Sequence, residues 1–552
     1  MLLVTDNRTQ VAILKGEGDE LAAEKIVSAL CLNTAEIQVR NARDQDKELL
    51  LSNCIIIGSS QSNPLISGFL EKAGLNGRYR QLNGEGYILK TISDKILLVA
   101  GATRVSTLYA ACDLKNYYLN YGEKTISADE LNIIEEPILK YRWFWNWDSR
   151  THWVPVSNRK ILSGHGNGFY PHRYEYEKDV FIQDFKTMLD YAAELHINGV
   201  VIWGFLRDEH GGVEAAQELC RFAEERGVRI IPGVGPNQYN GFYYSGNNRF
   251  NSITWTQGRP DLQALGPVDG FEKAEPIPTT LCLQKAENQS WLRDGVNWMY
   301  DSFDSIGGLD VETSEAWVCN CEDHKRISKG IHLSGSDQET YTAFPDDVEL
   351  AARIIMKEAR RRDPEAWIVL NTYNDLGTYP EKMIQRLMEI TPEAIVLWME
   401  RVRCQAKGKY PGINKALVFN WAPRGFDKVY HPLQWYKDSI ENAWRNGMDG
   451  VQIFGEGGAY LPCFELAYLA FSALAWNPRI SLDQLVRKYL ARFWGGEKAA
   501  MSLLEILPLV KMDINKAYQE AEKNAVSMDS TAKTHWEHLL KHILNQRTGE
   551  RK

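Results

Sequence analysis

The feature that most constrains the fold is a regular alternation of short apolar segments with helical patterns between residues 139 and 478. The apolar segments are typical of parallel strands covered on both faces. There are eight, at residues 141–148, 199–205, 228–235, 306–315, 366–373, 394–400, 416–422 and 450–456. This alternation predicts the α/β class with a central (β/α)8 TIM barrel at 139–478. The alternative is an open doubly wound sheet, which is less favoured because no strand is followed by a glycine-rich phosphate turn.

Two regions flank the predicted barrel. Residues 1–135 predict a small N-terminal α/β domain, with a helix at 19–30 and a hairpin at 85–101. No motif that carries chemistry is visible in this region. Residues 480–552 carry helical patterns and predict a helical C-terminal region.

The composition argues against several classes of partner. The formal net charge is −9 and no long basic run is present, so nucleic acid and anionic membranes are not expected as partners. The start of the chain lacks the pattern of a signal peptide, which predicts a cytoplasmic protein. A secreted protein already trimmed of its leader would look the same. The nine cysteines are scattered and odd in number, which favours reduced thiols over a disulfide framework. The oligomeric state stays open.

Polar and aromatic residues gather at the ends of the predicted strands. Function in such barrels sits at the carboxyl ends of the strands, where these side chains would converge. The chain has 17 Trp and 25 Tyr, whose flat faces suit sugar rings, although a large core uses the same residues. We therefore expect an oligosaccharide or glycoside substrate. The predicted binding residues are Trp145, Trp147, Asp148, Trp203, Arg207, Asn371, Tyr373, Trp398, Trp421 and Arg424.

Carboxylates are also concentrated at these strand ends. Asp310, Glu312 and Glu315 fall within six positions, and crowded acids raise one another's pKa values. Two carboxylates that flank a glycosidic bond are the minimum for its hydrolysis. Glu315 is the predicted general acid, with Glu400 or Glu456 as base or nucleophile. The alternatives are an acidic loop for the first three, an ion pair with a neighbouring arginine for Glu400, and a glycine-flanked loop acid for Glu456.

A cysteine-rich run follows the same segment. Cys319, Cys321 and His324 are residue types that bind zinc. Only three such ligands are close in sequence, whereas structural zinc takes four. Reduced cysteines that pack the loop are therefore expected, with no metal and no cofactor.

The segment from 305 to 323 resembles known barrel glycoside hydrolases. VETSEAW is similar to the segment after strand four of the alpha-glucuronidases of family 67, which implies that Glu315 donates the proton. GGLDVE is more loosely similar to a segment of the beta-N-acetylhexosaminidases of family 20, which points to Asp310 and Glu312. Both families place a small α/β domain before the barrel, as predicted for residues 1–135 here. The two base carboxylates of the glucuronidases have no clear match, so the sugar and the stereochemical outcome stay open.

These observations together predict a glycosidase. We expect it to be exo-acting on a non-reducing-end uronic acid or N-acetylhexosamine. Arg207, Arg401 and Arg424 are candidates to bind a uronate, because guanidinium groups pair well with carboxylates. Asp310 with Glu312 would instead suit an acetamide. The alternatives are a carbohydrate-binding protein on a degenerate barrel and a metal-dependent barrel isomerase or lyase.

Overall fold

The computed structural model describes most of the chain, and all structural statements concern these residues. They are 1–6, 8–9, 11–30, 37–43, 52–155, 174, 179–237, 239–267, 274–312, 319, 321–323, 345–371, 389, 393–399, 415–420, 429–526, 528 and 530–548. The chain divides into two compact units. The first comprises Met1–Ile138 with Asp190–His196, and the second comprises Leu139–Leu189 with Ile197–Lys552.

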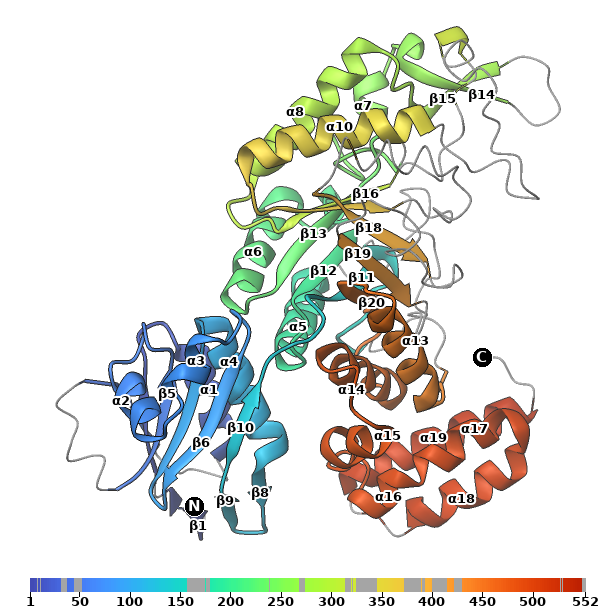
Figure 1. The fold of residues 1–552 in the computed structure, drawn as a ribbon. Helices are drawn as coiled ribbons and strands as arrows, with labels where there is room; N and C mark the ends of the chain where they lie inside the picture. Colours follow the sequence, from blue (N-terminus) through green and yellow to red (C-terminus); the bar gives the residue numbers. More distant parts are fainter. Residues whose placement is uncertain are drawn as a thin grey trace. The chain divides into compact units, whose positions relative to one another are not determined.

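The first unit is built on a six-stranded sheet with strand order β10-β6-β7-β5-β3-β4. The predicted hairpin is confirmed as β6 and β7, which pair antiparallel, and the predicted first helix is confirmed as α1. A second, four-stranded sheet has the order β2-β1-β9-β8. The elements of this unit, seen in Figure 1, are β1 Leu2–Thr5, β2 Arg8–Thr9, β3 Val11–Lys15, α1 Glu20–Leu30, β4 Gln38–Asn41, β5 Asn53–Gly58, α2 Leu65–Lys72, α3 Asn76–Arg80, β6 Tyr87–Ser93, β7 Ile96–Gly101, α4 Arg104–Asp113, β8 Leu119–Tyr121, β9 Thr125–Ala128 and β10 Asn132–Glu135.

The second unit is built on a curled sheet of eight parallel strands. All eight predicted strands are present, and each pairs with the next along the chain. The last strand also pairs with the first, so the paired strands form a closed ring. They are β11 Tyr141–Trp147, β12 Gly199–Trp203, β13 Arg229–Val234, β16 Gly308–Glu312, β17 Trp367–Asn371, β18 Ile395–Met399, β19 Lys415–Asn420 and β20 Gly450–Phe454.

Helices follow most of these strands and lie outside the sheet (Figure 1). The mixed α/β class with a parallel sheet is therefore confirmed. The segments after β17 and β18 fall largely outside the described residues. The helices are α5 Val180–Glu194, α6 Gly212–Glu225, α7 Ser252–Thr256, α8 Ala286–Ser302, α10 Pro345–Arg362, α13 Leu433–Arg445 and α14 Pro462–Trp476.

Aromatic side chains fill the inside of the closed sheet. In β11, residues two apart share a face, so Tyr141, Trp143, Trp145 and Trp147 all point inward. The rings fit inside the sheet because glycine residues on neighbouring strands leave space for them. A Cβ at Gly233 would lie 2.2 Å from the Trp203 ring, which only a residue without a side chain avoids. We call this column of buried rings the aromatic column.

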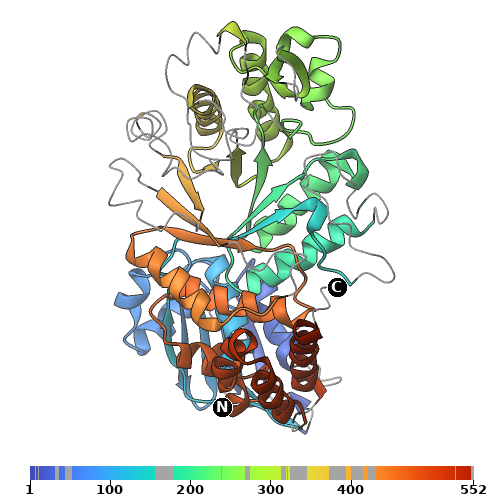
Figure 2. The same ribbon diagram turned by 90° about the vertical axis from the view of Figure 1, so that its right-hand side faces the viewer.

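The C-terminal region is helical, as its sequence pattern indicates. Its helices are α15 Leu482–Gln484, α16 Glu497–Met501, α17 Leu503–Met512, α18 Ile514–Val526 and α19 Ser530–Thr548 (Figure 2). Helix α19 contacts the segment before α13, where the Tyr430 hydroxyl and His538 Nδ1 are 2.9 Å apart. Among the helices described, none is both long and apolar enough to cross a lipid bilayer.

The structure also shows a hairpin that the sequence did not predict. The long excursion after β13 contains an antiparallel hairpin of β14 Gln263–Pro267 and β15 Ala274–Leu281. Two prolines interrupt β15, and proline within an apolar run argues against a strand.

Candidate active site

The carboxyl ends of the parallel strands bring several predicted site residues to one rim of the sheet. Asp148 follows β11, Arg207 follows β12, Glu312 ends β16 and Glu456 follows β20. All four are nearly fully buried, with exposed fractions of 0% for Asp148 and Glu456 and 2% for Arg207 and Glu312. Burying charged groups is costly unless they are paired or neutral. Each carboxyl therefore needs a physical explanation.

Three of the predicted sugar-binding tryptophans, Trp145, Trp147 and Trp203, lie in the aromatic column. Trp203 is completely buried, and Trp145 and Trp147 are 6% and 9% exposed. Their rings contact one another, with centroids 5.5 Å apart for Trp145–Trp147 and 5.4 Å for Trp147–Trp203. Tyr239, from the excursion after β13, contacts both Trp147 and Trp203. The three tryptophans thus form a packed floor beneath the rim.

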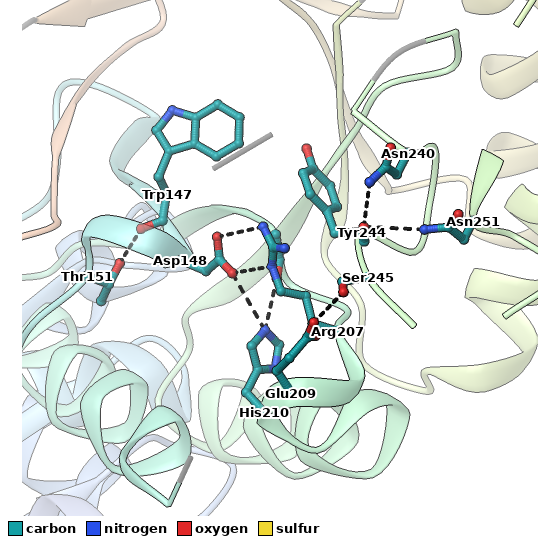
Figure 3. Close-up of polar contacts among 11 residues, drawn as sticks. Trp147, Asp148, Thr151, Arg207, Glu209, His210, Asn240, Tyr244, Ser245 and Asn251 are labelled. Atoms are coloured by element: carbon teal, nitrogen blue, oxygen red, sulfur yellow. Dashed lines mark hydrogen bonds and ion pairs between the residues drawn. The ribbon is translucent and has the colours of Figure 1, made fainter. Parts of the chain in front are cut away.

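Asp148 is paired with Arg207 (Figure 3). The guanidinium donates two hydrogen bonds to the carboxylate, from Nε to Oδ2 and from Nη2 to Oδ1, the latter at 3.3 Å. Gly204 has a φ of +80°, and a Cβ there would lie 2.1 Å from Asp148 Oδ1, so glycine is required at this turn. His210 Nε2 lies 3.8 Å from Asp148 Oδ2 and 3.0 Å from the Gly204 carbonyl oxygen. This bidentate pair braces the ends of β11 and β12.

A loop from the excursion after β13 covers this brace and contributes Tyr244. The Asn240 side chain donates to the Tyr244 carbonyl at 2.7 Å, and the Asn251 side chain donates to it at 3.3 Å. Ser245 donates to Glu209, which fastens the loop to the segment after β12 (Figure 3). The Tyr244 ring then lies 5.2 Å from the Arg207 guanidinium. Sequence reasoning missed Tyr244, which lies in the aromatic stretch GFYYSG at residues 241–246.

Asp310 and Glu312 form an acidic pair on β16. They are two residues apart on a strand, so both side chains lie on the same face. Asp310 Oδ2 accepts a hydrogen bond from the Trp203 indole at 3.1 Å, which places Asp310 on the inner face. Burial, together with the negative charge of Asp310, raises the pKa of Glu312 well above its usual range. Such a shift favours the protonated form of Glu312, which is the form that a general acid must hold.

The hydroxyl of Tyr244 is affected by the charges of both the Asp148–Arg207 pair and the acidic pair on β16. Burial raises the pKa of its hydroxyl well above the ordinary value, the Arg207 charge lowers that pKa, and the carboxylates of Glu312, Asp148 and Asp310 raise it further. The brace and the acidic pair are therefore parts of one site.

Glu456 is held at the rim by the end of β11. Its Oε1 accepts a hydrogen bond from the Trp147 backbone N–H at 3.3 Å, and its carbonyl accepts one from the His152 N–H at 2.8 Å. Trp153 donates its indole hydrogen to the Gly455 carbonyl at 2.7 Å. These contacts fix the Glu456 backbone on the side of the ring where β20 meets β11.

The remaining predicted site residues cannot be placed. Asn371 and Trp398 belong to β17 and β18, but their side chains are outside the described part of the chain. Glu315, Glu400, Tyr373, Trp421 and Arg424 lie outside the described residues altogether, as do Arg401 and His324.

Within the described residues, one group of side chains could hold a metal ion. It consists of Cys282, Cys319 and Cys321, all buried. Cys282 was not among the predicted zinc ligands, because it lies 39 residues before Cys321 in the chain.

Comparison with known proteins identifies the fold. No family model matches the chain. No curated protein sequence matches it either. Among solved structures, a GH138 enzyme targeting pectin rhamnogalacturonan II has a TM-score of 0.60 at 12% identity over 97% of this chain and 85% of that one.

Two other structural neighbours are also described as glycoside hydrolases. A family GH115 4-O-methyl-alpha-glucuronidase with specificity for decorated arabinogalactans has a TM-score of 0.59 at 12% identity, covering 98% of this chain and 72% of that one. A GH20 exo beta-N-acetylglucosaminidase from Vibrio harveyi has a TM-score of 0.50 at 13% identity, covering 92% and 75%. The predicted resemblance to barrel glycoside hydrolases is therefore confirmed at the level of the fold.

Proposed function

We propose that the second unit is a (β/α)8 barrel and that the chain is a glycoside hydrolase acting on a non-reducing-end sugar. The observation that carries the proposal is the acidic pair, in which Glu312 is buried on the same strand face as Asp310 and its pKa is raised well above the usual range. A protonated carboxylic acid at the carboxyl end of a barrel strand can protonate the leaving oxygen of a glycosidic bond. The three structural neighbours named above belong to glycoside hydrolase families, which supports the same class.

The second carboxylate in the proposal is Glu456. It follows β20, the strand that closes the ring. One of its carboxylate oxygens accepts a hydrogen bond from the Trp147 backbone N–H. A carboxylate in this position could act as base or nucleophile while Glu312 acts as acid. Glu315 and Glu400 stay candidates for the same two roles from the sequence alone.

An N-acetylhexosamine is favoured over a uronic acid as substrate. Recognition of a uronate calls for a guanidinium that can turn toward the sugar, and Arg207 is already committed to Asp148. Asp310 beside a protonated Glu312 provides an acceptor next to the acid, which suits the N–H of an acetamide. Arg401 and Arg424 remain the arginines through which a uronate would be bound.

The experiment is a panel of nitrophenyl glycosides of N-acetylglucosamine, glucuronic acid, galactose and xylose. We expect turnover of the N-acetylglucosaminide above the others. Preferential turnover of the glucuronide would overturn the substrate assignment but keep the enzyme class. Sugar binding without turnover of any member would overturn the enzyme class and favour a carbohydrate-binding protein.

A further inference from the structure

Three buried thiols from two separate segments meet outside the candidate active site. Cys282 directly follows β15, and Cys319 and Cys321 belong to the segment that follows β16. Their exposed fractions are 0%, 2% and 8%, and the three sulfur atoms all lie within 4.8 Å of one another. None of the cysteines in the described residues is in a disulfide. We propose that this three-thiol cluster binds a Zn²⁺ ion.

The spacing of the sulfur atoms fits zinc. Cys282 Sγ and Cys321 Sγ are 3.7 Å apart. Two thiolates on a tetrahedral zinc, each at about 2.3 Å from the metal, lie about 3.8 Å apart. A disulfide would need about 2.05 Å between the same atoms. The three thiols fill three of the four positions of a zinc ion, and a water molecule can fill the fourth.

The surroundings support bound thiolates. The Leu265 backbone N–H donates to Cys319 Sγ at 3.3 Å, and such outer hydrogen bonds orient metal ligands. The Cys282 carbonyl accepts from the Asn288 side chain at 2.9 Å and from the Lys285 N–H at 3.1 Å, which fixes the first segment. Lys285 also pairs with Asp323 at 3.5 Å, a second link between the same two segments. Zinc binding would replace three S–H protons by three Zn–S bonds and release those protons to solvent.

The ion would fasten the segment after β16 to the β14–β15 hairpin. This segment directly follows Glu312, the proposed acid, and contains Glu315 before it reaches Cys319. Zinc would therefore hold the far end of the stretch that carries both candidate acids. Its role is structural and adds nothing to the proposed hydrolysis step.

The test measures metal content in the full-length protein purified from zinc-supplemented cells without chelators. We expect about one zinc per chain in the parent protein and in Cys220→Ala, a control at a buried cysteine of α6. Cys282→Ala should lose most of the zinc. A parent protein that stays free of zinc after zinc is added back would overturn the proposal. Equal zinc in both variants, or a Cys282–Cys321 disulfide in the purified protein, would overturn it too.

Cobalt gives a second measurement that needs no variant. Co²⁺ exchanged into the parent protein should show the intense thiolate-to-cobalt charge-transfer absorption of a site with several sulfur ligands. Stripping the metal should lower the thermal midpoint, and zinc should restore it. Cobalt bound without charge-transfer absorption would mean that the thiols are not ligands. These readouts do not depend on hydrolytic activity, so failure of the proposed function would leave them unchanged.

Discussion

Asp148 and Glu312 make an instructive comparison. Both follow or end strands of the same sheet, both are buried at the same rim, and both raise the pKa of Tyr244. Asp148 is paired with the Arg207 guanidinium, whereas the charge nearest to Glu312 is that of another acid, Asp310. The nature of the nearest charge, rather than the depth of burial, thus separates a structural brace from a proposed proton donor. The tests below can break or sharpen this distinction.

The largest effect is expected for Glu312→Gln. Loss of a general acid should slow cleavage of a glycoside with a poor leaving group by about two to four powers of ten. A dinitrophenyl glycoside, which departs without protonation, should be affected much less. Steady-state rates on both substrates provide the measurement, with exposed Glu225→Gln as the control. Should Glu315→Gln show this dependence on the leaving group and Glu312→Gln not, the acid is Glu315.

Arg207→Leu should mainly affect stability. It leaves the Asp148 charge buried without its principal cation, which typically costs about 3–5 kcal/mol of unfolding free energy. The double variant Asp148→Asn with Arg207→Leu should lose less, because no uncompensated carboxylate remains. Urea unfolding of both variants would measure the difference. Equal losses in the two variants would contradict the role of this pair as a brace.

A smaller effect is expected for Trp203→Phe, which removes the indole donor to Asp310. Trp143→Phe is a matched control, since that ring is equally buried and its nitrogen has no hydrogen-bond partner among the described residues. The Trp203 variant should lose about 1–3 kcal/mol more than the control, the cost of leaving a buried acceptor unsatisfied. Equal losses of unfolding free energy in the two variants would show that the hydrogen bond from Trp203 to Asp310 does not contribute to stability.

The smallest effect is expected for the pH dependence of the unfolding free energy. The pKa of Glu312 is raised on folding, so its contribution to stability is complete below the pKa of the unfolded chain and is lost as pH rises toward the folded pKa. Within that window the parent protein should lose about 1.4 kcal/mol per pH unit relative to Glu312→Gln, which does not titrate. Urea unfolding of both proteins at a series of pH values above about 4.3, the pKa of an unfolded glutamate, would measure it. Parallel curves would mean that Glu312 is ionised in the fold.

The sequence predicted the eight parallel strands well, because buried parallel strands are short apolar runs separated by helical patterns. It was less informative about side chains. The period of two in YRWFWNW already puts Trp145 and Trp147 on the same face as Tyr141 and Trp143, so an interior column could have been inferred. The pairing of Asp148 with Arg207 and the approach of Cys282 to Cys321 join residues 59 and 39 positions apart. Such contacts depend on the tertiary structure and leave no local pattern.

The aromatic column also makes the second unit its own optical probe. All 17 tryptophans of the chain lie at or beyond Trp143, so the first unit contributes only tyrosine emission. Stacked rings such as Trp143 and Trp367, 5.3 Å apart, should couple their electronic transitions and give a distinctive near-ultraviolet dichroism. Tryptophan fluorescence would then follow the unfolding of the second unit alone, while peptide dichroism follows both units. Transitions that do not coincide would show that the two units unfold separately.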